Sequence, residues 1–323
     1  MKKKLLSGIQ PSGTIHIGNY FGAIKQFVDL QNEYDSSVFI ADLHAITTIQ
    51  NREELSKNIL NVALDYLACG LDPEKICLFK QSDVPEVAEL AWYFNCLTTV
   101  PYLERATAYK DAHMKAKEVN VGLFDYPILM AADILIQDAD VVPVGADQKQ
   151  HIEYARDTAQ KFNNTYGEIF KLPEALIMKN VAIVPGIDGR KMSKSYKNTI
   201  PLFGSDEEIK KAVMKIVTDS KNTEDKKDPE TCNIFALHKL FLKEDELKDL
   251  RDKYTNGGLS YKESKEMLLK EILDVIRPMR EKREMYANDL DKVHTILNNG
   301  AEKARVVIRE KMKIIRDKVG VNF

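Results

Sequence analysis

Cysteine is scarce in this chain. Only four cysteines stand among 323 residues (Cys69, Cys77, Cys96 and Cys232), and no two of them form a CxxC pair. Neither a zinc knuckle nor a disulfide framework is therefore predicted. Buried thiols that pack as small apolar side chains are the better interpretation.

Long apolar runs and a strong excess of one charge are also missing. No uncharged stretch is long enough to span a bilayer, and Gly8 and Pro11 interrupt the apolar run that should follow the basic start of a signal peptide. We therefore expect a cytoplasmic protein. Residues 1–204 have 21 basic against 25 acidic side chains and residues 205–323 have 26 against 24, which is too even to predict nucleic-acid binding. The basic stretch at 301–318 fits a solvated helix face about as well as phosphate contacts.

The first two thirds of the chain alternate short apolar runs with helical patterns. Helices are predicted at about 18–33 and 52–69, between apolar runs typical of buried strands at 5–9, 38–41, 76–79, 141–144 and 181–184. Such alternation predicts a parallel sheet covered by helices, with ligands at the carboxyl ends of the strands.

After Asp206 the apolar β-type runs disappear. Helical periodicity is present at 207–217, 234–242, 262–284 and 290–319. Lys221–Glu230 is almost entirely polar or charged, which predicts a mobile loop. Because a chain of this length usually forms two domains, we expect fold class α/β, with a Rossmann-like nucleotide-binding domain (residues 1–204) and an all-helical domain (residues 205–323) after it.

A first chemical motif, QPSGTIHIGN at residues 10–19, lies between the first predicted strand and the first predicted helix. Gly13 and Gly18 remove side chains where a ligand can approach the backbone, and a helix N-terminus offers free N–H groups to an anion. His16 and Asn19, three residues apart, can direct donors toward the same phosphates. The motif predicts a phosphate site, although any strand-to-helix turn can contain such glycines.

A second motif, KMSKS at Lys191–Ser195, follows a glycine-containing turn at residues 185–189. Two lysines on a hinged loop form a mobile cationic clamp, which suits a reaction that develops negative charge on transferring and leaving phosphates. A lysine-rich loop alone is usually solvated surface. Together with the turn at residues 16–19, and in this order, it indicates phosphate chemistry.

These motifs resemble a known family. The His16–Asn19 turn resembles the HIGH signature, and Lys191–Ser195 is an intact KMSKS signature, of class I aminoacyl-tRNA synthetases. Residues 7–13 (SGIQPSG), 126–135 (YPILMAADIL) and 142–151 (VPVGADQKQH) resemble the bacterial tryptophanyl-tRNA synthetases in particular. The similarity extends over about the whole chain and implies a tryptophan–tRNA ligase. Such an enzyme activates L-tryptophan with ATP, releases pyrophosphate and transfers the amino acid to tRNA(Trp).

The resemblance implies an ATP site and the residues that form it. Asp147 is expected to bind the ribose hydroxyls, and backbone groups around Ile183 and Val184 to bind adenine. The residues expected to be catalytic are His16, Asn19, Lys191 and Lys194. The ATP site as a whole is expected to contain Gln10, Pro11, Ser12, Gly18, Asn19, Gly145, Ala146, Asp147, Ile183, Val184, Lys191, Met192, Ser193, Lys194 and Ser195. Mg²⁺ is expected on the ATP phosphates, without a metal site in the protein.

Specificity for the amino acid is expected to come from Tyr126–Leu135. Pro127 can begin a helix, which places Tyr126, Met130 and Asp133 on one face. A carboxylate in this apolar run requires donors, and an indole N–H is one; a hydrogen bond within the protein is the alternative. By resemblance, the tryptophan pocket contains Leu6, His44, Met130, Asp133, Val142 and Val144, with Tyr126 and Gln148 near the substrate amino group.

The chain departs from the family at some positions. Ala108 and Ala112 stand where relatives have Gln and Lys, so Lys110 or Lys115 is expected to replace those contacts. Some relatives bind an iron–sulfur cluster through four cysteines of the helical domain; only Cys232 lies there, and no cluster is expected. The family works as a homodimer, and the helices between residues 85 and 140 are the expected contact.

Three alternatives share some of these features. Tyrosyl-tRNA synthetases have the same fold and ATP motifs, but their substrate helix usually contains a Gln and a second acid that Met130–Asp133 lacks. Small nucleotidyltransferases have a similar turn without the KMSKS loop and the long helical domain. A non-catalytic tRNA- or protein-binding relative is expected to lose a lysine or the His16 and Asn19 pair, and this chain retains them.

Overall fold

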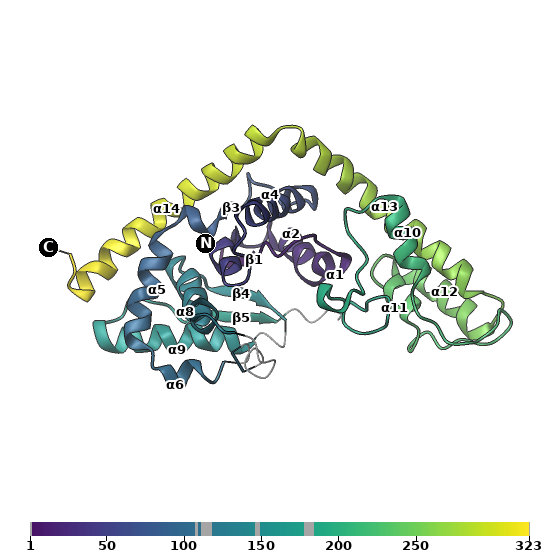
Figure 1. Ribbon diagram of the computed structural model, residues 1–323, viewed down its shortest axis with the longest axis horizontal. Coiled ribbons are helices and arrows are strands. Elements are labelled where there is room, and N and C mark those ends of the chain that lie inside the picture. Colours follow the sequence, from purple (N-terminus) through teal and green to yellow (C-terminus); the bar gives the residue numbers. More distant parts are fainter. Residues whose placement is uncertain (1, 107–108, 111–117, 146–148, 178–183, 323) are drawn as a thin grey trace.

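The computed structural model describes residues 2–106, 109–110, 118–145, 149–177 and 184–322. Within these ranges, five strands form one parallel sheet in the order β3-β2-β1-β4-β5 (Figure 1). They are β1 (Lys4–Ile9), β2 (Asp35–Ile40), β3 (Cys77–Lys80), β4 (Val141–Val144) and β5 (Glu174–Ile177). The first four were predicted. β5 was missed because a half-exposed run of four residues has no recognisable period, and of the run predicted at 181–184 only Val184 is described, outside any strand.

Helices connect the strands. Among the described residues before position 200, the helical segments include α1 (Ile17–Asn19), the π-helical turn η1 (Tyr20–Ile24), α2 (Lys25–Leu30), α3 (Asp42–Ile46), α4 (Arg52–Ala68), η2 (Gln81–Asp83), α5 (Glu86–Leu97), α6 (Val100–Leu103), α8 (Val121–Ile136), α9 (Lys149–Tyr166) and η4 (Lys194–Tyr196). They are followed by α10 (Asp206–Met214), α11 (Asn233–His238), α12 (Glu244–Asn256), α13 (Tyr261–Ala287) and α14 (Leu290–Val319). All predicted helices are confirmed within a few residues, and α14 at both ends.

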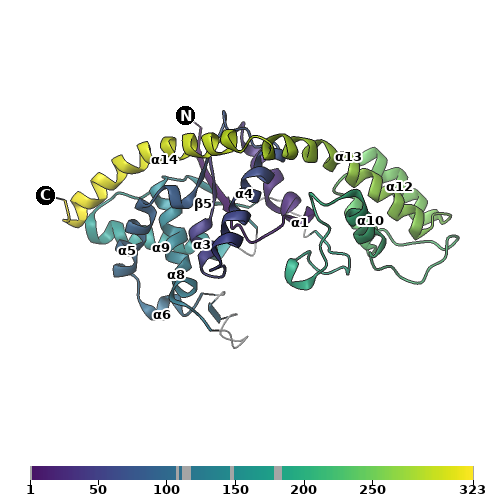
Figure 2. The ribbon, with the colours of Figure 1, turned by 45° about the horizontal axis from the view of Figure 1, so that its top comes forward.

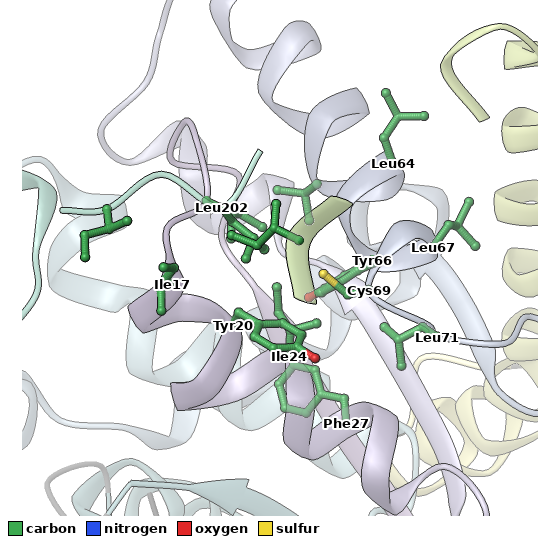
Figure 3. Packing of buried hydrophobic residues seen from close by; sticks show 14 of the residues in the cluster. Ile17, Tyr20, Ile24, Phe27, Leu64, Tyr66, Leu67, Cys69, Leu71 and Leu202 are labelled. Carbon is green, nitrogen blue, oxygen red and sulfur yellow. The ribbon is translucent and has the colours of Figure 1, made fainter. Parts of the chain in front are cut away.

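Both faces of the sheet are buried, as the continuous apolar strands predict. Along β2, Val38 and Ile40 pack into one hydrophobic cluster, whereas Phe39 packs into the other, because side chains alternate along a strand. The first cluster lies under α1, α2 and α4 and includes Tyr20 and Leu67 (Figure 3). The second lies under α5, α8 and α9. This arrangement holds the strand ends in a fixed position relative to the helices that follow them.

The two longest helices form an arch over the molecule (Figures 1 and 2). α13 follows the helical part, and α14 returns along the α/β part beside the edge strand β3. The α14 side chains buried in the second cluster are Ala301, Ala304, Ile308, Met312 and Ile315, at helical spacing. The Cys77 thiol donates to the Gly300 carbonyl at 3.0 Å. α14 therefore covers an edge that would otherwise present unpaired backbone groups.

The other half of the arch is bound to the α/β part by arginine. Arg283 of α13 donates to Asp65 Oδ1 at 2.6 Å and to Asn61 Oδ1 at 2.8 Å, both on α4. Burial raises the pKa of Asp65 to about 6, against the opposing effect of Arg283. This pair joins the helical part to the helix that backs the first turn of the chain.

The polar segment Lys221–Glu230, predicted as a mobile loop, folds around a buried lysine. Lys227 is 2% exposed, and its ammonium donates to the carbonyls of Asn222, Thr223 and Asp225 at 2.7, 3.2 and 3.1 Å. A charge surrounded by backbone carbonyls can be buried, and composition alone does not reveal such a turn. No helix among the described residues combines the length and apolar content needed to cross a membrane.

Gly300 provides a test of the α14 docking. A Cβ at this position would lie 1.9 Å from the Leu78 carbonyl oxygen and 2.6 Å from its carbon, and these backbone atoms cannot rotate away. In an exposed helix, Gly→Ala stabilises by about 1 kcal/mol. Gly300→Ala is instead expected to destabilise by about 1–3 kcal/mol in urea unfolding, because α14 must move off β3. The exposed Asn299→Ala is the matched control, and stabilisation of both variants would contradict this packing.

Candidate functional site

The predicted site lies where the strand order changes direction. β1 pairs with β2 on one side and with β4 on the other, and the chain reaches β4 only after β3. In parallel sheets a crevice opens at such a point, at the carboxyl ends of the strands. The turn at residues 10–19 leaves β1 there, and Gly145 leaves β4. The topology thus brings together the two halves of the predicted ATP site.

His16 and Asn19 cap the first helix reciprocally. His16 Nδ1 accepts from the Asn19 backbone N–H at 3.3 Å, and Asn19 Oδ1 accepts from the His16 N–H at 3.1 Å. Because Nδ1 is an acceptor, the hydrogen of the neutral ring is assigned to Nε2. Burial, and then the charge of Lys194, lower the pKa of His16 to about 4. The ring is therefore a neutral hydrogen-bond donor at physiological pH.

The lysine loop is docked on this turn. The Gly18 N–H donates to Met192 Sδ at 3.3 Å, and Lys194 Nζ donates to the Ser12 carbonyl at 3.0 Å. A Cβ on Gly18 would lie 2.9 Å from His16 Nδ1 and 3.2 Å from Met192 Cβ, so a side chain here would require the His16 and Met192 side chains to shift. Met192, predicted at the ATP site, has a buried side chain that joins the two motifs.

A residue that the sequence analysis missed determines the shape of the loop. Asn198 is 1% exposed. Its Oδ1 accepts from the Ser193 N–H at 2.8 Å, while its Nδ2 donates to Asp188 Oδ1 at 2.7 Å and to the Lys191 carbonyl at 3.1 Å. In the sequence, the sign of this role is an uncharged amide side chain directly after the lysine-rich loop. Asn198 thereby fixes the backbone on both sides of Met192.

The remaining predicted ATP-site residues are arranged as follows. Gln10, Ser12, Lys191, Lys194 and Ser195 are exposed, and Pro11 is buried. Ser193 Oγ and Ser195 Oγ are 2.9 Å apart. The Val184 carbonyl accepts from the Met192 N–H at 2.9 Å, so this group is already paired within the loop. Ala146, Asp147, Gln148 and Ile183 lie outside the described residues, as do Ala108, Ala112 and Lys115.

The predicted tryptophan pocket lies on β1, β4 and α8. Leu6 and Val142 share one buried cluster, and Met130 and Val144 pack partly buried against it. Contrary to expectation, Pro127 does not begin α8: the helix starts at Val121, capped by Asn120, and Pro127 lies inside it. The Asn120 side chain caps this earlier start, where it accepts from the Leu123 N–H at 2.8 Å. The common face of Tyr126, Met130 and Asp133 is unaffected, because their spacing of four and three residues is the same in the longer helix.

Asp133 is buried, and the protein supplies its donors. Gln81 Nε2 lies 2.9 Å from each Asp133 carboxylate oxygen, and His44 Nε2 lies 2.9 Å from Oδ2. Burial raises the pKa of Asp133, while the hydrogen bonds from His44 and Gln81 lower it. Gln81 was not predicted, although a polar residue directly after β3 lies at the ligand-binding edge.

Tyr126 faces the same region. Its hydroxyl lies 2.7 Å from His151 Nε2, and its ring is 6.5 Å from that of His44, edge to face. Burial raises the pKa of Tyr126 to about 12, so the phenol stays protonated. The site therefore combines a buried acid and aromatic rings on one side with a donor-rich, cationic turn on the other. It can bind a small apolar molecule beside a chain of phosphates.

A Rossmann-type sheet in which a HIGH-like turn and a KMSKS loop are in contact defines the class I aminoacyl-tRNA synthetases. Comparison with known proteins agrees: the pattern of the tRNA synthetases class I (W and Y) matches residues 2–276. A tryptophan–tRNA ligase of Fusobacterium nucleatum is 52% identical over 320 residues, which are 99% of this chain and 98% of that protein. The chain belongs to this synthetase family and, within it, to the bacterial tryptophan–tRNA ligases.

Solved structures agree with this assignment. The tryptophanyl-tRNA synthetase of Campylobacter jejuni complexed with ADP and tryptophan superposes with a TM-score of 0.92 at 48% identity and covers 98% of this chain and 99% of its own. A tyrosyl-tRNA synthetase of Archaeoglobus fulgidus reaches a TM-score of 0.69 at 20% identity, covering 87% of this chain and 90% of its own. At that identity the likeness shows the fold alone.

Lys194 is the clearest target in the loop. Lys194→Ala is expected to slow adenylate formation by about 10²–10³, the usual effect of losing one preorganised donor to developing charge. Tryptophan binding should barely change, because the lysine meets charge that develops on the phosphates. Single-turnover kinetics and equilibrium tryptophan binding measure the two effects, with the exposed Lys210→Ala as control. A loss of tryptophan affinity as large as the loss of rate would exclude this role.

Proposed function

We propose that this chain joins L-tryptophan to ATP, forming tryptophanyl-adenylate and pyrophosphate, and then transfers the tryptophanyl group to tRNA(Trp). The observation on which this depends is the contact between the lysine loop and the turn at residues 10–19, which follows β1. The turn and the loop provide donors and positive charge for phosphates. Asp133 and its apolar neighbours provide a place for the amino acid ring.

The chemistry is an attack of the tryptophan carboxylate on the α-phosphorus, with breakage of the bond to the β-phosphate. It needs no nucleophilic side chain, so positioning and charge stabilisation are what the protein contributes. Neutral His16 donates from Nε2, Asn19 from its amide, and Lys191 and Lys194 stabilise the pyrophosphate as it leaves. Mg²⁺ enters on the ATP phosphates as part of the substrate, because it usually keeps several waters and few protein ligands.

The substrate contacts follow from the positions of the predicted residues. We assign ATP to the turn at residues 10–19, to residues 145–147 after β4, to residues 183–184 and to the lysine loop. We assign the indole ring to Leu6, Met130, Val142 and Val144, with its N–H on Asp133. Leu6 and Val142 support this assignment, since β1 pairs with β4 one residue earlier, at Leu5 and Val141. Tyr126 and Gln148 are assigned to the amino group.

The protein is proposed to work as a cytoplasmic homodimer. Support comes from three large apolar side chains exposed on the expected interface helices: Trp92 of α5 (66%), Val100 of α6 (59%) and Val121 of α8 (78%). Val100 and Val121 line one hollow of about 390 Å³ together with Phe124. Large apolar side chains exposed on neighbouring helices are typical of an interface.

The helical domain, residues 205–323, is assigned to the anticodon of tRNA(Trp). Its helices α10, α11 and α12 lie at the far side of the arch from the α5–α9 layer (Figure 1). Within this domain α14 packs beside the edge strand β3, so α10 to α13 are the helices available to bind RNA.

An amino-acid-dependent ATP–pyrophosphate exchange assay tests the proposal. Across the twenty amino acids, exchange should be fastest with tryptophan by a wide margin, because Asp133 lies next to a pocket of apolar side chains. Lys194→Ala protein serves as the background control. A faster rate with tyrosine would overturn the substrate, and no exchange with any amino acid would overturn the enzyme.

Asp133 is expected to determine the choice of tryptophan. An analogue with sulfur in place of the indole nitrogen should be activated about ten- to a hundredfold less well, since the charged acceptor loses a partner worth about 1.5–3 kcal/mol. Asp133→Ala should weaken tryptophan and largely remove the preference over the analogue.

Variant and analogue together form a double-mutant cycle, which separates the specific contact from general damage. If the variant keeps the wild-type ratio between the two substrates, Asp133 is a structural carboxylate.

A further inference from the structure

We propose that Gln81 is a positioning residue for tryptophan specificity, which holds the Asp133 carboxylate in the orientation that accepts the indole N–H. This inference rests on the proposed function, because it requires Asp133 to contact the substrate. Gln81 follows β3 directly, in η2, and is 1% exposed. It lies beneath the assigned pocket and needs no contact with tryptophan itself.

The orientation of the Gln81 amide is fixed by the backbone of α3. Its Oε1 accepts from the N–H of Leu43 at 3.1 Å and from the N–H of His44 at 3.4 Å. Both N–H groups belong to the first turn of a helix, where no intrahelical carbonyl is available. The amide oxygen therefore has to face α3. A flipped amide would remove the acceptor of the His44 N–H, would leave the Leu43 N–H with Asp42 Oδ1 alone, and would direct a carbonyl oxygen at a carboxylate.

The other end of the amide then faces Asp133. Nε2 lies 2.9 Å from both carboxylate oxygens, so that it holds the carboxylate symmetrically. His44 Nε2 adds a second donor on Oδ2 at 2.9 Å. An ionised carboxylate has about four lone-pair sites, and these two partners leave some of them for a substrate donor. The direction of the free sites is set by where Gln81 and His44 attach.

Gln81 and His44 make different contributions. The His44 imidazole lies on one carboxylate oxygen, whereas the Gln81 amide has no ionisable proton and donates to both oxygens of Asp133. The hydrogen bond from Gln81 favours the ionised form of Asp133 against the effect of burial, which raises the pKa. Without that donor the acid takes up a proton at higher pH, and a protonated acid accepts an indole N–H less well.

Two substitutions separate the functions of the amide. Gln81→Met removes both the donor and the acceptor at similar length. Gln81→Glu keeps an acceptor for α3 and, when ionised, replaces the donor by a negative charge beside Asp133. The control is Ser82→Ala, because Ser82 Oγ also binds η2 to α3, through Asp42 Oδ2 at 2.5 Å, without touching Asp133.

The measurement is kcat and KM in pyrophosphate exchange for tryptophan and for the sulfur analogue, between about pH 5.5 and 9. For Gln81→Met we expect tryptophan kcat/KM to fall about ten- to a hundredfold, mainly through KM. The analogue should fall much less, and the acid limb of the tryptophan profile should move to higher pH. For Gln81→Glu the tryptophan reaction should recover as pH falls, since a protonated glutamic acid can again donate. Ser82→Ala should affect both substrates equally.

Equal losses for both substrates, with an unchanged acid limb, would overturn the proposal and make Gln81 a structural residue. If Gln81→Met does not fold, Gln81→Glu decides the question, because it retains the contacts to α3. Asp133→Ala separates the proposed function of Asp133 from the proposed role of Gln81. If that variant keeps the preference for tryptophan over the analogue, the proposed function of Asp133 is wrong. If it removes the preference and the Gln81 variants keep it, only the role of Gln81 is wrong.

Discussion

The contact between Gly18 and Met192 joins two motifs that are 174 residues apart in the chain. Position 18 has no side chain, so the loop can lie close to the turn. Met192 is buried, and the packing of its side chain fixes the position of the loop. Lys194 then lies on the Ser12 carbonyl, at the end of β1. The cationic group of the site is thus placed by apolar packing and by one backbone N–H. Electrostatic attraction to a phosphate is not needed to bring it there.

The buried Asp133 carboxylate is the opposite case, because its burial is unfavourable for the folded protein. Placing Asp133 in an apolar layer raises its pKa, and an unpaired carboxylate there would be strongly destabilising. The structure offsets this with an amide and an imidazole drawn from the segments that follow β3 and β2. Both come from carboxyl ends of neighbouring strands, which in a parallel sheet meet at one edge. The same topology that opens the crevice therefore provides the hydrogen-bond partners of the buried acid.

The helical arch links the stability of the fold to the site. α14 closes the edge of β3, from which Gln81 follows directly, and Gly300 allows the helix to lie against the Leu78 carbonyl. α13 is tied to α4 through Arg283 and Asp65. Because α4 packs behind the first turn in one hydrophobic cluster, the helical part has a direct mechanical connection to the nucleotide side of the site.

The sequence by itself determined the layered α/β fold, the long helices and four of the five strands in the described part of the chain, since apolar patterns mark them. It also indicated the two phosphate motifs and the acid at position 133, because glycine, lysine and a lone carboxylate are visible without coordinates. Only the tertiary structure decided that Met192 is an anchor, that Asn198 shapes the loop, that Gln81 holds Asp133 and that Lys227 is buried. Each of these depends on a hydrogen bond to backbone or to a distant segment. Such bonds leave no period in the sequence, because the partner is chosen by where the chain returns in space.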